Sequence, residues 1–128
     1  MKIFIIVLAA LLVTVFVFAD TVELAGTWKG TTEADGNSVD LTLVLKKDAD
    51  VYSGNITAPG YADNAEIKDV EFVDNILKFS FTVYNGSEYL EIKVNLSVSE
   101  DRMTGGWDSE DGDSGSIIIE KTSISLDI

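Results

Sequence analysis

The sequence predicts an all-β protein: an eight-stranded antiparallel up-and-down β-barrel that follows an N-terminal signal helix. Three observations lead to this prediction. Apolar and polar residues alternate along several segments, which is typical of strands with one buried face. Residues that favour turns separate these segments at short intervals. The chain also matches itself at an offset of 51 residues, which indicates two halves of four strands each.

The first nineteen residues have the organisation of an export signal. Lys2 precedes a stretch from Ile3 to Phe18 that is apolar except for Thr14, and the small residue Ala19 ends that stretch. We predict cleavage after Ala19, so that 1–19 is a signal peptide and 20–128 is one secreted or periplasmic domain. The alternative is an uncleaved membrane anchor, because the apolar run is close to the shortest helix that spans a bilayer. The chain contains no cysteine, which excludes a lipid-anchored lipoprotein.

The composition limits the chemistry of the predicted domain. The chain has 22 acidic residues, 9 basic residues and no histidine. Such an acidic surface repels nucleic acid and anionic lipid. Without histidine and cysteine, the commonest general base and the usual zinc ligands are missing. Carboxylate pairs could serve glycoside chemistry, but none has a sequence context that indicates burial. We therefore expect no enzyme, no cofactor, no metal, no nucleic-acid partner and no stable membrane insertion after cleavage.

Alternation and turn signals together define eight predicted strands. The clearest alternation places Val39, Leu41, Leu43 and Leu45 on one face. The strands are expected over 26–32, 39–46, 51–57, 66–73, 76–84, 88–99, 102–108 and 114–121. Charged residues lie on the polar faces, so the apolar faces point into the barrel. An outer-membrane barrel would have the opposite arrangement and longer strands.

The internal match covers two hairpins. The segment from Val39 to Leu45 aligns with the segment from Leu90 to Leu96. Ser53-Gly54 then aligns with Thr104-Gly105. A duplicated four-strand half would explain the match and would give an eight-stranded sheet closed on itself. The alternative is that any two hairpins with one buried face resemble each other. A glycine inside a strand also suits a sharply bent barrel strand.

Gly26-Thr27-Trp28 opens the first predicted strand with a G-x-W motif. This motif resembles the start of the lipocalin, fatty-acid-binding and avidin families, which form the calycin group. The segment from Gly26 to Gly30, followed by that from Val51 to Ile56, is similar to the first three strands of avidin-like proteins. The resemblance implies that Trp28 closes one end of the barrel against a basic side chain of the last strand. Lys121 is the candidate, where the family usually has arginine. The side chains of a biotin site are not recognisable, so we do not predict biotin binding.

The resemblance also implies a function. We expect a secreted lipocalin-like protein that holds a small apolar ligand in its barrel. The predicted lining is Leu43, Ile56, Phe79, Phe81, Ile92, Val94 and Trp107. Because phenylalanine and leucine face inward, the barrel could instead be filled by its own side chains. The alternative function is therefore a ligand-free interaction or structural domain that recognises a cell-surface protein or carbohydrate, with Tyr61, Tyr84 and Tyr89 as contacts.

Two further segments complete the predictions. Carboxylates are concentrated between Asp108 and Asp113, but Gly112 stands where the calcium loop of an EF-hand needs a ligand. This segment is interpreted as a solvated hairpin tip. The tail from Thr122 to Ile128 continues an alternation, which could pair with the first strand or with a second copy of the chain.

Overall fold

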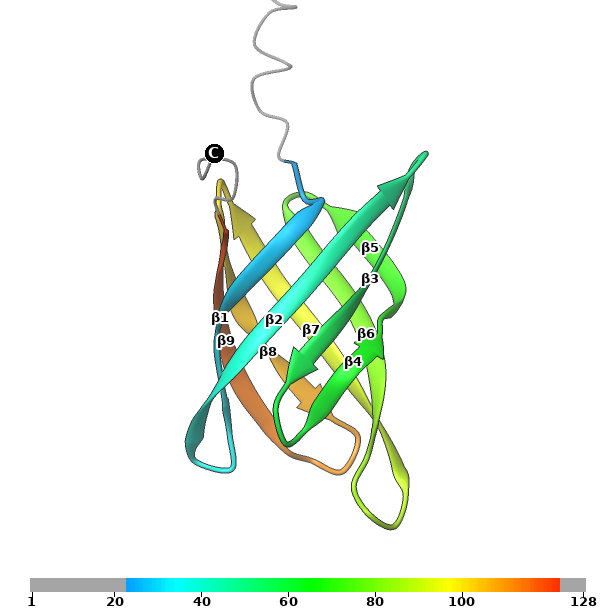
Figure 1. Cartoon of the computed structure of the whole chain (residues 1–128), viewed down its shortest axis with the longest axis vertical. Coiled ribbons are helices and arrows are strands. Elements are labelled where there is room, and N and C mark those ends of the chain that lie inside the picture. Colours follow the sequence, from blue (N-terminus) through cyan, green and yellow to red (C-terminus); the bar gives the residue numbers. More distant parts are fainter. Residues whose placement is uncertain (1–22, 123–128) are drawn as a thin grey trace, which may run out of the picture.

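The structure is a computed structural model that describes residues 23–122. These residues form nine strands in one antiparallel sheet, which confirms the predicted all-β class (Figure 1). The strands are β1 (Gly26–Ala34), β2 (Asn37–Asp48), β3 (Val51–Ala58), β4 (Ala62–Glu66), β5 (Lys68–Val73), β6 (Ile76–Tyr84), β7 (Tyr89–Ser99), β8 (Arg102–Ser109) and β9 (Ser114–Lys121). The predicted signal peptide, 1–19, and tail residues 123–128 lie outside the described residues. Within 23–122, no helix is long and apolar enough to cross a membrane.

The predicted count of eight strands is wrong, and the hydrogen-bonded sheet is not closed. The sheet order is β4-β3-β2-β1-β9-β8-β7-β6-β5, so β4 and β5 are its two edges. The strand expected over 66–73 begins at Lys68 as β5, and the unpredicted strand β4 precedes it, separated from it by Ile67. The physical reason is a change of partner, because β4 pairs with β3 whereas β5 pairs with β6. Asn64 and Asp69 have positive φ angles of 51° and 53°, which bend the chain on both sides of Ile67.

Antiparallel connections give the sheet two distinct ends. The turns at 35–36, 59–61, 85–88 and 110–113 lie at one end, which we call the mouth. The turns at 49–50, 74–75 and 100–101 lie at the opposite end, the base, beside the first and last described residues (Figure 1). The position of each inward-facing residue between the mouth and the base can therefore be stated.

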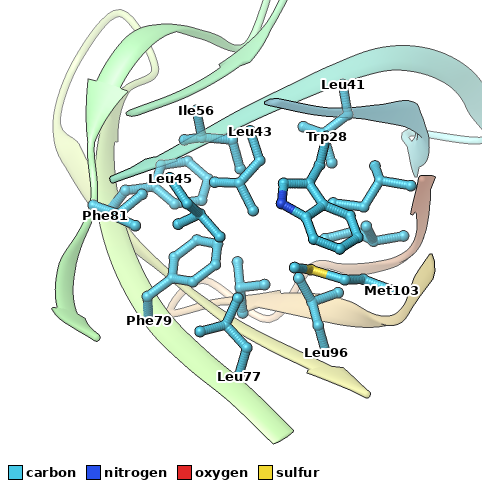
Figure 2. Packing of buried hydrophobic residues seen from close by; sticks show 14 of the residues in the cluster. Trp28, Leu41, Leu43, Leu45, Ile56, Leu77, Phe79, Phe81, Leu96 and Met103 are labelled. Carbon is cyan, nitrogen blue, oxygen red and sulfur yellow. The ribbon is translucent and has the colours of Figure 1, made fainter. Parts of the chain in front are cut away.

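Large apolar side chains fill the base half of the interior. Trp28 and Met103 lie side by side there, surrounded by leucines from several strands (Figure 2). The largest fully buried side chains are Trp28, Leu24, Leu43, Leu45, Ile56, Leu77, Leu96, Met103 and Ile119. Burial of each such side chain contributes roughly 1.5–3 kcal/mol to folding. This end of the molecule is therefore a packed core.

The strand pairing repeats at the offset seen in the sequence. Leu45 pairs with Gly54 between β2 and β3, and Leu96 pairs with Gly105 between β7 and β8; both members of the second pair lie 51 residues further on. Similarly, Trp28 pairs with Leu43 between β1 and β2, and Phe79 pairs with Val94 between β6 and β7. Alternation of apolar and polar residues does not by itself require the corresponding strand pairs of the two halves to have the same pairing register. The equality therefore favours two related four-strand halves over chance similarity.

Candidate functional site

A cavity of about 360 Å³ opens at the mouth. Its volume is near the lower end of the range of roughly 300–1,000 Å³ for small-molecule sites. Its inner wall is apolar and comprises Leu41, Ile56, Ala58, Ala62, Phe81, Val83, Leu90, Ile92, Val94, Trp107 and Ile117. Its rim is formed by residues of the mouth turns, among them Asp35, Gly60, Tyr61, Asn85, Asp111 and Asp113. The cavity thus combines an apolar interior with a polar, acidic entrance.

Five of the seven residues predicted to contact a ligand line this cavity, namely Ile56, Phe81, Ile92, Val94 and Trp107. Leu43 and Phe79 do not, and both are buried in the core. Leu43 lies two residues nearer the base than Leu41 along β2, and Phe79 lies two residues nearer the base than Phe81 along β6. These two side chains therefore form part of the packing beneath the cavity.

Trp107 is held in place by hydrogen bonds to β1. Its Nε1 donates to Thr32 Oγ1 at 3.0 Å and to the carbonyl oxygen of Glu33 at 3.2 Å. The Thr32 hydroxyl, which is buried, donates in turn to the carbonyl oxygen of Ser116 at 2.8 Å. The polar edge of the indole is thus satisfied within the protein. Its ring is left as a fixed wall of the cavity.

Tyr61 and Asp35 connect two turns across the rim. The Tyr61 hydroxyl donates to Asp35 Oδ2 at 3.3 Å, although the residues are 26 positions apart. Desolvation at the mouth raises the pKa of Tyr61, and the Asp35 charge and this hydrogen bond raise it further. Neither residue was predicted to line a cavity, because turns carry no periodic pattern.

We expect Asp35→Asn to lower the pKa of Tyr61 toward the ordinary tyrosine value of 10.0. The reason is that the substitution removes a negative charge that opposes ionisation of the phenol. Because the folded-state pKa is raised, the contribution of Tyr61 to stability is present below pH 10.0 and is lost as pH rises through the folded-state pKa. Absorbance titration of tyrosinate measures the shift, with Tyr61→Phe identifying the signal. An unchanged Tyr61 midpoint would contradict this reading of the rim.

The acidic turn between β8 and β9 also forms part of the rim. The N–H of Asp113 donates to Asp111 Oδ1 at 3.2 Å, and the N–H of Asp111 donates to Ser109 Oγ at 3.4 Å. The hydrogen bond with the Ser109 side chain, followed by that from Asp113, lowers the pKa of Asp111. Asp111 therefore stays ionised at neutral pH. Over residues 23–122, no group of three acidic side chains is arranged to hold a metal ion.

At the base, the structure brings Trp28 and Lys121 together. Trp28 is fully buried, and its Nε1 donates to the carbonyl oxygen of Leu24 at 2.9 Å. Lys121 Nζ lies 5.6 Å from the centroid of the Trp28 ring and donates to the carbonyl oxygen of Glu23 at 2.6 Å. The ammonium is within the range of a cation–π contact. The indole and the lysine together cover the base end of the core.

The cavity places an indole, a phenol, carboxylates and apolar side chains around one space. Among its lining residues, all within 23–122, no lysine or arginine occurs. No protein-family model, curated protein or solved structure matches the chain.

Proposed function

We propose that the nine strands form a lipocalin-like closed barrel with eight strand positions, in which β4 and β5 are halves of one bent strand. Only Ile67 separates the two halves, and its N–H donates to the carbonyl oxygen of Gly54 in β3 at 3.0 Å. The next residue, Lys68, pairs with Ser80 of β6. The segment 62–73 thus connects both edges of the sheet. Such closure would protect edge strands that could otherwise pair with other chains.

We further propose that this protein is an exported binding protein that holds a small, mainly apolar ligand in the mouth cavity. The observation that carries this proposal is the contrast between the two ends of the interior. Side chains fill the base, whereas a space of about 360 Å³ with an apolar wall opens at the mouth. A concave apolar space with a few polar groups at its entrance is typical of small-molecule sites.

Filling the cavity should abolish binding. Ala58 is buried and lines the cavity, so Ala58→Phe would place a ring in the ligand space. We expect delipidated wild-type protein to retain octanol or geraniol in native mass spectrometry, and Ala58→Phe to lose at least tenfold in affinity for both. Thr31→Phe, at an exposed position on β1, is the control and should bind as wild type does.

A second cavity-filling variant guards against a folding defect. Ala62 faces Ala58 across the β3–β4 pairing and also lines the cavity, so Ala62→Leu should weaken binding in the same direction. Melting curves establish that each variant is folded. If the wild type retained no probe, or if the filled variants bound as well as the wild type, the cavity would not be a ligand site.

One observation favours surface recognition as a second candidate function. Tyr84 and Tyr89 flank the β6–β7 turn with ring centroids 4.9 Å apart, and they are 56% and 72% exposed. Tyrosines that present a large ring and a hydroxyl are common at protein interfaces. A protein or carbohydrate partner contacting this pair becomes the leading function if the cavity proves not to bind.

A further inference from the structure

We infer that the mouth cavity selects amphiphiles with a cationic head group, in particular alkylammonium compounds, and this inference rests on the proposed ligand-binding function. The hydrocarbon part of such a ligand would enter the apolar interior beside Ile56 and Phe81. The ammonium group would remain at the rim, beside the acidic turn between β8 and β9. Charge, the internal repeat and the aromatic residues of the mouth each support this assignment.

The rim charge is of one sign. Asp35, Asp111 and Asp113 line the cavity, and no basic residue does so in the described part of the chain. A fatty carboxylate with its tail in the cavity would place its own charge near these aspartates without a counter-ion. An ammonium in the same position would be attracted to them.

The internal repeat shows a difference in charge between corresponding positions of the mouth. At the offset of 51 residues, Asp111 and Asp113 correspond to Gly60 and Ala62. Gly60 lies in the β3–β4 turn and Ala62 begins β4, and both also line the cavity. At these two positions the first half of the mouth is small and uncharged, whereas the second half carries two carboxylates. A ligand with one charged side would match this asymmetry.

Aromatic rings add a second attraction for cations. Trp107 and Tyr61 both line the cavity, and the Trp107 ring is fixed by its hydrogen bonds to Thr32 and Glu33. The face of an indole or phenol attracts an ammonium group, and tryptophan is the strongest of these partners. Carboxylates combined with aromatic rings are a suitable environment for a substituted ammonium.

The test compares three probes that have alkyl chains of similar length and different head groups: octyltrimethylammonium, octanol and octanoate. Calorimetric titration of the delipidated protein is carried out at about 0.15 M salt, which screens electrostatic interactions beyond roughly 8 Å. We expect the ammonium compound to bind at least tenfold more tightly than octanol, which corresponds to about 1.4 kcal/mol. Octanoate should bind most weakly of the three.

Matched variants separate the rim from the net charge of the protein. The triple variant D35N/D111N/D113N should reduce the preference for the ammonium probe over octanol to threefold or less. The control D48N/D50N/D101N removes the same charge from exposed residues at the base and should keep the preference. Asparagine tolerates the positive φ of Asp35, which is 52°.

The outcomes distinguish this inference from the proposed function. Equal binding of all three probes, or an equal loss of preference in both triple variants, would overturn the cationic selectivity while cavity binding stands. Failure of every probe, octanol included, would overturn the ligand-binding function itself. Selective loss in the rim variant alone supports both.

Discussion

Replacing Trp28 by alanine is expected to lower the free energy of unfolding by about 3–5 kcal/mol. The side chain is fully buried at the base and packs among the leucines and Met103 of the core. Its loss would leave a cavity and would remove the donor for the buried carbonyl oxygen of Leu24. For a domain of this size, each kcal/mol corresponds to roughly 4–8 °C in melting temperature. Urea denaturation and thermal melting both measure the effect.

Two comparisons show whether Trp28 acts as the plug of the base. Trp28→Phe keeps most of the ring but loses the hydrogen bond, so an intermediate loss is expected. Trp107→Ala removes the same side chain from a partly buried position at the mouth, so a smaller loss is expected. A larger cost for Trp107→Ala than for Trp28→Ala would show that the base is not the main packed region of the protein.

The strands that were predicted most accurately are those whose pattern is local. The limits of β6 and β9 coincide with the predicted ranges 76–84 and 114–121, because alternation and turn residues mark both ends of each strand. β4 was missed because Ala62–Glu66 has no alternation of apolar and polar residues. It is a strand because it pairs with β3, and such pairing outweighs local preference.

The sequence predicted which residues of the site point inward, but not how far from the mouth each of them lies. Alternation shows which residues point inward, so Leu43 and Phe79 were grouped with residues that line the cavity. Alternation alone does not show whether an inward-facing residue lies near the base or near the mouth. It also does not show that Trp28 and its neighbours fill the space at the base. The rim aspartates lie in turns, where no periodicity indicates orientation. The 51-residue offset was a usable signal, because Ile56 and Trp107 are equivalent under it and both line the cavity.

Alanine at Gly54 or at Gly105 should destabilise the protein by about 1–3 kcal/mol, and by similar amounts at the two positions. A Cβ atom on Gly54 would overlap the carbonyl oxygen of Val44 and lie 3.2 Å from the Cα atom of Leu45. A Cβ atom on Gly105 would overlap the carbonyl oxygen of Asn95 and lie 2.9 Å from the Cα atom of Leu96. In both cases the obstacle is the backbone of the partner strand, which cannot move aside without disturbing the ladder. Chemical denaturation of both variants measures the cost.

The two glycine variants also test whether the halves of the chain are structurally equivalent. Gly54 is buried beneath neighbouring residues, whereas Gly105 is exposed, so similar costs cannot arise from similar burial. They would arise from the close approach of paired strands at the same point in each half. Ser53→Ala and Thr104→Ala, at the preceding exposed positions, are the controls and should change stability by less than about 0.5 kcal/mol. If only Gly54→Ala destabilised the protein, the burial of Gly54 and not the repeated strand geometry would account for the loss. The two hairpins would then share a pairing register without sharing a structural constraint.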